Sequence, residues 1–124
     1  MIVGLGVDLT EINRVERSIE RFGQRFIDRV LGPSEQNGLP RKRLAEYVAA
    51  RFAAKEAAVK ALGTGFAEGI GFHDLQVTRN SAGKPGMIFH GPALEHMQAM
   101  GGQRILLTLT HAKDMAAAVV IIES

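Results

Sequence analysis

Residues 41–62, RKRLAEYVAARFAAKEAAVKAL, are the stretch that decides the fold. They are rich in Ala, Lys, Arg, Glu and Leu, which are the strongest helix formers, and the three residues Gly63-Thr64-Gly65 follow as a stop signal. Large apolar side chains recur along the segment at Leu44, Val48, Phe52, Val59 and Leu62. The pattern predicts a long central helix with an apolar stripe facing the core.

The chain before this helix changes from a strand pattern to a helix pattern. Residues 2–9, IVGLGVDL, predict a buried β-strand that ends at an acid, and Thr10 is expected to cap the helix that follows. Apolar residues then recur with the period of a helix over residues 14–30, and Gly23 can break or bend that helix. The opposite face is basic, with Arg14, Arg17, Arg21, Arg25 and Arg29.

The chain after the central helix alternates between strand and helix patterns. We expect a hairpin that pairs residues 72–78 with 87–90, a short helix at 92–100, and two final strands at 104–110 and 115–123. No repeat or linker divides the chain. The sequence therefore predicts one α+β domain over residues 1–124, with a mostly antiparallel sheet packed against the long helix.

Composition excludes several classes of function. The 124 residues include no cysteine, which excludes a disulfide framework, a thiolate nucleophile and cysteine-ligated metal sites. The longest apolar run, residues 115–122, is far shorter than the ~20 residues that span a membrane, and the N-terminus has no positive leader. We expect a cytoplasmic protein with no membrane partner. The net charge of +2 does not by itself indicate a nucleic-acid binder.

The remaining candidate site consists of oxygen ligands and a cation near a glycine-rich loop. Glycines 63, 65 and 69 follow a helix and lack the dinucleotide-binding spacing, and there is no Walker loop, nucleophilic-serine motif or paired-histidine metal motif. Asp8, Glu56 and Lys60 are compatible with a metal-bridged polyphosphate held at the loop. The alternative is that Glu56 and Lys60 form an ordinary helix-surface pair while Asp8 caps the next helix.

Three blocks of sequence carry a family resemblance. Residues 4–15 are GLGVDLTEINRV, residues 51–65 are RFAAKEAAVKALGTG, and residues 109–114 are LTHAKD. They resemble the opening, central and closing motifs of the holo-acyl-carrier-protein synthases, which are small stand-alone 4′-phosphopantetheinyl transferases. Two positions depart from the family pattern: Thr110 stands where the family often has Ser, and Met115 where an aromatic residue is common.

The resemblance implies a reaction and a metal. Enzymes of this family transfer phosphopantetheine from coenzyme A to a serine of apo-acyl carrier protein, in fatty acid biosynthesis, and release adenosine 3′,5′-bisphosphate. Asp8 and Glu56 match the family's ligands for Mg²⁺. We expect Glu56, or a metal-associated water, to remove the serine proton, and Lys60 to stabilise or protonate the leaving phosphate.

The resemblance also implies binding surfaces. Gly63, Thr64 and Gly65 are expected along the nucleotide, and Arg51 and His111 near its 3′-phosphate. Family members are homotrimers with active sites at the subunit interfaces. The arginine face then has a natural partner, because an acidic carrier protein can dock on its cations: Arg14, Arg17, Arg21 and Arg25.

Two alternatives remain open. The arginine face can instead bind a nucleic-acid backbone, although no stretch of the chain interleaves aromatic and basic residues to stack bases. The final strand, residues 116–122, is apolar at every position, so that both of its faces need cover. Either subunit contact or helices on both faces of the sheet can supply that cover.

Overall fold

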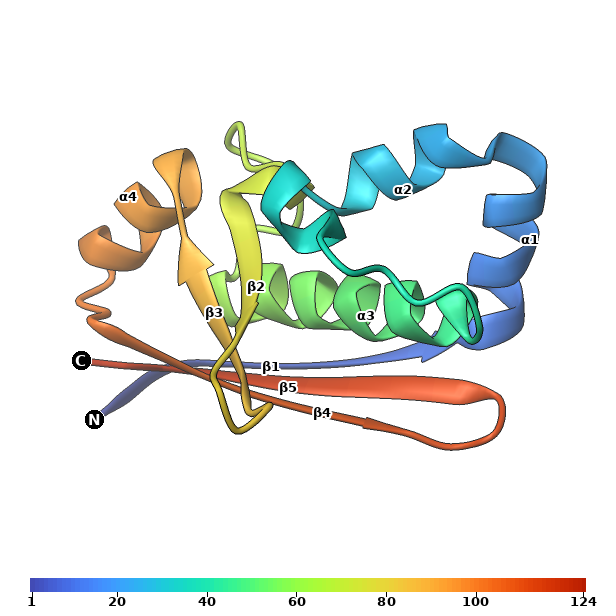
Figure 1. Ribbon diagram of the computed structural model, residues 1–124. Coiled ribbons are helices and arrows are strands. Elements are labelled where there is room, and N and C mark those ends of the chain that lie inside the picture. The colour runs from blue at the N-terminus through green and yellow to red at the C-terminus, as the bar shows by residue number, and fades with distance from the viewer.

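The computed structural model describes all 124 residues and confirms the α+β class, with a three-stranded and a two-stranded sheet packed around one long helix (Figure 1). The larger sheet has the order β1-β5-β4 and the smaller one pairs β2 with β3, all antiparallel. The bounds of the strands in the two sheets are β1 (Ile2–Glu11), β2 (Leu75–Arg79), β3 (Pro85–Phe89), β4 (Arg104–His111) and β5 (Met115–Glu123). No helix is both long and apolar enough to cross a membrane.

The long helix, α3 (Leu44–Leu62), starts three residues later than expected because Arg43 adopts a left-handed backbone conformation. Its end is as predicted, at a left-handed Gly63. The helix is not amphipathic, however. Its buried residues, most of them alanines, lie on almost every side of it, where it packs between the sheet and the other helices. Phe52, expected in the core stripe, is only half-buried and lies beside a cavity.

The predicted N-terminal helix is two helices, α1 (Ile12–Phe22) and α2 (Gln24–Val30), separated at Gly23, whose positive φ breaks the run. The expectation that Thr10 caps this helix is wrong. Strand β1 continues to Glu11 and α1 starts without any side-chain cap. Short 3₁₀ turns at Pro33–Gln36 and Phe72–Asp74 and the helix α4 (Gly91–Ala99) complete the chain.

Strand β1 contacts α3 almost backbone to backbone. Gly4 and Gly6 lie on the strand face that α3 covers, and a Cβ atom at either position would overlap a carbonyl oxygen of the helix, from Ala61 or Ala57. A side chain here would therefore push the helix away from the strand. The G-x-G spacing of the first motif thus fixes how β1 and α3 lie together, and Asp8 follows on the same face.

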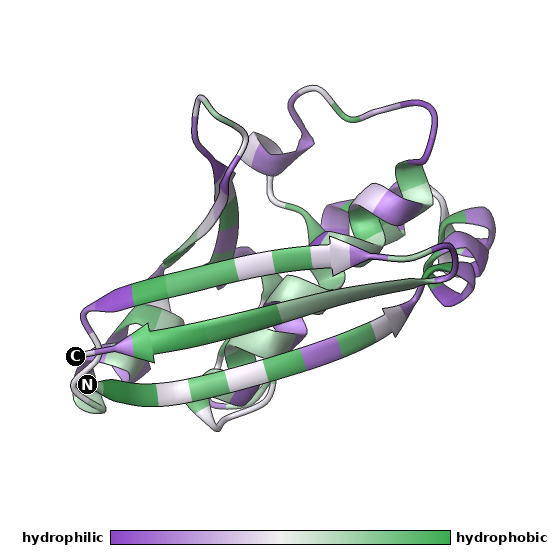
Figure 2. Ribbon diagram, turned by 90° about the horizontal axis from the view of Figure 1, so that it is seen from below, coloured by the Kyte–Doolittle hydropathy of each residue, from purple (hydrophilic) through white to green (hydrophobic).

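Helices cover only one face of the larger sheet. Figure 2 views the opposite face, where the three strands run side by side without a covering element. Its exposed apolar side chains come from the odd positions of β1 and from β4, and include Leu5, Val7, Leu9 and Leu106. The sequence left two ways to cover both faces of β5, subunit contact or helices on both sides of the sheet. The second alternative is therefore wrong.

Candidate active site

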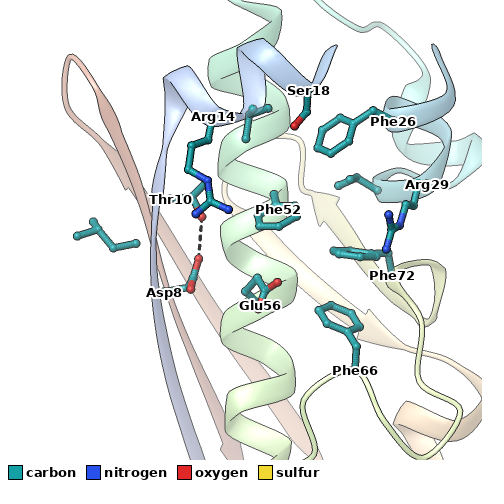
Figure 3. Close-up of a pocket in the computed structure, with 13 residues that line it drawn as sticks. Asp8, Thr10, Arg14, Ser18, Phe26, Arg29, Phe52, Glu56, Phe66 and Phe72 are labelled. Atoms are coloured by element: carbon teal, nitrogen blue, oxygen red, sulfur yellow. Dashed lines mark hydrogen bonds between the residues drawn. The ribbon is translucent and has the colours of Figure 1, made fainter. Parts of the chain in front are cut away.

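A cavity of about 550 Å³ opens between β1, α1, α2 and α3 (Figure 3). Asp8 and Glu56 lie on one side of it and Arg14 and Arg29 line it from α1 and α2. Four aromatic residues form a further part of its wall, with successive ring centroids 4.2–6.5 Å apart: Phe26, Phe52, Phe72 and Phe66. The cavity therefore combines carboxylates, guanidinium groups and an apolar surface.

Asp8 lies inside β1, three residues before its end, so it does not cap the next helix. Both of its oxygens accept hydrogen bonds: Lys60 Nζ donates to Oδ1 at 3.0 Å and Thr10 Oγ1 donates to Oδ2 at 2.7 Å. Lys60 Nζ also donates to the Val7 carbonyl at 3.2 Å. The structure thus joins the first and second motifs, whose residues Asp8 and Lys60 are 52 positions apart in sequence.

Glu56 lies one helical turn before Lys60 on α3 and faces the same cavity. Burial and then the neighbouring Asp8 carboxylate raise its pKa, and the Lys60 ammonium opposes them. A carboxylate whose ionised form is disfavoured by a neighbouring carboxylate gains from a cation bound beside both. Lys60 donates its hydrogen bonds to β1 and not to Glu56, so the alternative of an ordinary helix-surface pair between Glu56 and Lys60 is wrong.

The oxygen ligands at this site are few but of the type that Mg²⁺ prefers. No group of three or more metal-ligating side chains occurs in the protein, and the cavity offers the two carboxylates of Asp8 and Glu56. Mg²⁺ commonly takes one or two carboxylates and completes its shell with water and substrate phosphate oxygens. The residues present fit a magnesium ion that binds together with a phosphate-containing substrate.

The predicted nucleotide residues divide between two places. Gly63, Thr64 and Gly65 follow the end of α3 at Leu62, with positive φ at both glycines, and lead to Phe66 on the cavity wall. Arg51 and His111 do not reach this cavity. They line a second one of about 460 Å³, together with the basic side chains Lys42, Arg43 and Arg79.

Arg51 is the buried member of this second cavity, with only 6% of its surface exposed. Its guanidinium lies over the Tyr47 ring, 3.6 Å from the centroid. Burial lowers the pKa of Arg51, and nearby Arg79 adds to the effect, while Tyr47 opposes it. The cluster carries more positive than negative charge, since Glu46 is the only acid that lines the cavity, and this charge suits an anionic group.

The four predicted docking arginines form one group of three and one separate residue. Arg14, Arg17 and Arg21 line a shallow depression on α1 with Ser18 and Phe22. Arg25 is exposed on α2, beyond the break at Gly23. The helical periodicity was continued across that break in the prediction, which is why all four were expected on a single face.

Sequence reasoning missed the aromatic wall and most of the second basic cluster. Phe66 lies within the glycine-rich segment 63–71 and Phe72 directly follows it, but an aromatic residue beside such a loop is not a specific signal for a site. The sequence pattern places the basic run at residues 41–43 in the helix. In the structure this run precedes α3, and Lys42 and Arg43 line the second cavity with Arg51. Thr10 could have been found from its spacing, since it shares a strand face with Asp8.

Comparison with known proteins places the chain in a family. The profile of the 4′-phosphopantetheinyl transferase superfamily matches residues 4–120, and the chain belongs to it. The holo-[acyl-carrier-protein] synthase of Maridesulfovibrio salexigens is 54% identical over 99% of both chains. That of Nitratidesulfovibrio vulgaris strain DP4 is 51% identical over the full length of both. Within the superfamily, the relatives that match along the whole chain are thus holo-[acyl-carrier-protein] synthases.

Solved structures agree with this assignment. The crystal structure of the holo-[acyl-carrier-protein] synthase from Neisseria meningitidis has a TM-score of 0.90 and 36% identity, and the match covers 100% of both chains. The enzyme from Bacillus anthracis, solved in complex with coenzyme A (3′,5′-ADP), has a TM-score of 0.83 and 38% identity, covering 100% of this chain and 98% of that chain. The resemblance found in the three motifs is confirmed.

Proposed function

We propose that the protein transfers the 4′-phosphopantetheine group of coenzyme A to a serine hydroxyl of an apo-acyl carrier protein. The products are a holo-acyl carrier protein for fatty acid synthesis and adenosine 3′,5′-bisphosphate. The observation that carries this proposal is the arrangement of three side chains: Asp8 and Glu56 line one cavity, and Lys60 donates a hydrogen bond to Asp8. The chain's relatives from Maridesulfovibrio salexigens and Nitratidesulfovibrio vulgaris, which match along its whole length, are holo-[acyl-carrier-protein] synthases. An intact-mass measurement tests it directly: an apo carrier protein incubated with the enzyme, coenzyme A and Mg²⁺ should gain one phosphopantetheine mass.

The proposed mechanism assigns a role to each of the three residues. Mg²⁺, held by Asp8 and Glu56, would neutralise charge on the pyrophosphate of coenzyme A. Glu56, or a water that it polarises, takes the proton from the carrier serine. The serine oxygen then bonds to the pantetheine-side phosphorus while that phosphorus loses its bond to the 5′-phosphate oxygen. Lys60 stabilises the charge that develops on this leaving phosphate.

Replacing Glu56 by Gln tests the base. The change preserves shape and removes the charge, so we expect turnover to fall by ~10²–10⁴-fold. The dependence on Mg²⁺ concentration should shift to higher values, because one of two carboxylate ligands is lost. Full turnover of Glu56→Gln with an unchanged Mg²⁺ dependence would exclude both roles.

The separation of the two cavities supports a site completed between subunits. Asp8 and Glu56 line one cavity, whereas Arg51 and His111, proposed to bind the 3′-phosphate, line the other. The uncovered sheet face has apolar side chains that a second subunit would bury, such as Val7 at 60% and Leu9 at 65% exposure. A homotrimer with interfacial active sites accounts for both observations, and light scattering of the purified protein tests the trimer.

Mixing two inactive variants tests the shared site. Glu56→Gln and Arg51→Met each damage one half of it, and reassembled mixtures should regain activity because about a quarter of the interfaces then combine two intact halves. The matched control mixes Glu56→Gln with Lys60→Met, two changes in the same half, and should regain none. Equal recovery in both mixtures would contradict a site shared in this way.

The arginines of α1 are proposed to dock the carrier protein. Arg14, Arg17 and Arg21 gather three cations on α1 beside the cavity, and Arg25 is a further exposed cation on α2. Such a surface attracts an acidic protein and speeds its association. The double variant Arg14→Glu/Arg21→Glu should raise the KM for carrier protein with little change in the KM for coenzyme A. If the variant instead lost salt-sensitive binding to random DNA, and carrier transfer was unaffected, the nucleic-acid alternative would be favoured.

A further inference from the structure

We propose that Thr10 is a positioning residue for Asp8, and that its hydroxyl holds one carboxylate oxygen in place so that the other faces the cation site. This inference rests on the proposed function, since it concerns how Asp8 is presented to a divalent cation. None of the three sequence motifs gives Thr10 a role in the reaction. The one role expected for it, a helix cap, is excluded by the structure.

The two hydrogen bonds to Asp8 differ in permanence. Thr10 is 8% exposed, whereas the Lys60 side chain is 53% exposed. A long, exposed lysine can swing away from Oδ1 at small cost, and it must do so to reach a phosphate. The buried threonine hydroxyl has no comparable freedom. The hydrogen bond to Oδ2, at 2.7 Å, therefore persists when Lys60 turns to the substrate.

The backbone around Thr10 fixes its hydroxyl. Asp8 and Thr10 are two residues apart on β1 and point to the same side, while Leu9 between them points to the uncovered face. Both residues are paired with the central strand, Asp8 opposite Ala118 and Thr10 opposite Ala116. The β-branched side chain of threonine also has few χ1 rotamers. The donor is thus in position before any ligand binds.

A hydrogen bond of this kind influences cation binding. Carboxylates that ligate metals are commonly held by a further donor, and loss of that donor typically costs ~10–100-fold in metal affinity. Without Thr10 the Asp8 carboxylate could rotate, and Lys60 could bind both of its oxygens. We therefore expect the hydroxyl to matter more for cation affinity than for the stability of the fold.

Two substitutions separate these effects. Thr10→Val keeps the branched shape and removes the donor, whereas Thr10→Ser keeps the donor. Mn²⁺ serves as the probe, with free Mn²⁺ followed by electron paramagnetic resonance in the presence of coenzyme A and without carrier protein. Thr10→Val should bind Mn²⁺ ~10–100-fold more weakly than wild type, and Thr10→Ser within about threefold of it. Thermal unfolding without metal, and the KM for coenzyme A at saturating Mg²⁺, should be similar in both variants.

The outcomes distinguish this inference from the proposal on which it rests. A wild-type protein that binds no Mn²⁺ overturns the cation site of Asp8 and Glu56, and the role of Thr10 with it. A wild-type protein that binds Mn²⁺ while Thr10→Val binds it equally well overturns the role of Thr10 alone. The same holds if Thr10→Ser is as weak as Thr10→Val, because the hydroxyl would then not be the group that matters.

Discussion

Two lysines of α3, five residues apart, form ion pairs with opposite characters. Lys55 is completely buried and pairs with Glu35 at 2.8 Å, and the glutamate side chain is 4% exposed. Lys60 pairs with Asp8 at 3.0 Å but leaves half of its side chain in solvent. The distances are nearly equal, so distance does not tell which lysine is free to act on a substrate. Burial does.

The pair Lys55–Glu35 connects elements that form the cavity wall. Lys55 Nζ also donates to the Val30 carbonyl at the end of α2, at 2.6 Å. Glu35 accepts from the backbone N–H of Gly32 and, through its other oxygen, from that of Val77 in β2. Lys55 Nζ thus has two hydrogen-bond acceptors, and both Glu35 oxygens have at least one donor. The pair fixes α2 and β2 relative to α3, whereas Lys60 has a half-free ammonium available for chemistry.

The largest expected effect comes from breaking the buried pair on one side. Lys55→Met leaves the Glu35 carboxylate buried without its cation, and we expect the free energy of unfolding to fall by ~3–5 kcal/mol. Urea denaturation measures it. Adding Glu35→Gln removes the stranded charge and should recover part of the loss, which also provides a variant if Lys55→Met does not fold. A loss below about 1 kcal/mol would place Lys55 among ordinary surface pairs.

The matching change at Lys60 should affect rate instead of stability. Lys60→Met removes a donor to the leaving phosphate, and we expect turnover to fall by ~10²–10³-fold, as for loss of one preorganised donor elsewhere. The unfolding free energy should change by less than about 1 kcal/mol, because the ammonium is largely solvated. Steady-state kinetics and urea denaturation on the same preparation test both parts. A variant that is unstable but fully active when folded would reverse the contrast with Lys55.

Sequence patterns predicted the elements of the fold well, because helix formers, strand alternation and glycine stops act locally. The two motifs that carry Asp8, Glu56 and Lys60 are likewise apparent in the sequence. What the patterns could not predict depends on tertiary contacts. Nothing local distinguishes Lys55 from Lys60, since both lie on α3 among alanines, and only the packing of Glu35 against α3 buries one of them.

The same limit explains the divided site. Arg51 and Glu56 are five residues apart on one helix, and the family resemblance implies that both serve one nucleotide. The structure places them in different cavities because they emerge from different sides of α3. Thr10 was misassigned for a related reason: its type and position fit a helix cap, and only the extension of β1 to Glu11 turns its hydroxyl to Asp8.

A pH dependence should distinguish the buried lysine further. Burial lowers the pKa of Lys55 below its ordinary value of 10.5, although Glu35 opposes the shift. Between the lowered pKa and 10.5 the unfolded chain binds more protons than the folded one, so this lysine makes stability rise with pH. Relative to Lys55→Met, the wild-type protein should gain stability as pH increases toward 10.5.

Urea denaturation across the alkaline range checks the sign. Lys84→Met provides the control, because it removes an exposed lysine at the hairpin tip and leaves the buried pair intact. The rise relative to Lys55→Met should remain in that control. A fall of the wild-type curve relative to Lys55→Met over this range would mean that Glu35 outweighs burial and that the pKa of Lys55 is raised.

The smallest expected effect is at the ion pair between Arg104 and Glu123, which is more exposed than the ion pairs of Lys55 and Lys60. Arg104 donates from Nε at 2.9 Å and Nη2 at 2.7 Å to one oxygen of Glu123, across the paired ends of β4 and β5. The Arg104 side chain is 70% exposed, so solvent and salt screen the attraction. Arg104→Met should cost at most about 1 kcal/mol in low salt and less in high salt. Urea denaturation at one fixed protein concentration, with and without added NaCl, measures the difference, since subunit association would otherwise contribute. If this short, exposed pair proved as stabilising as Lys55–Glu35, then geometry and not burial would govern the ion pairs of this protein, and the distinction between Lys55 and Lys60 would lose its basis.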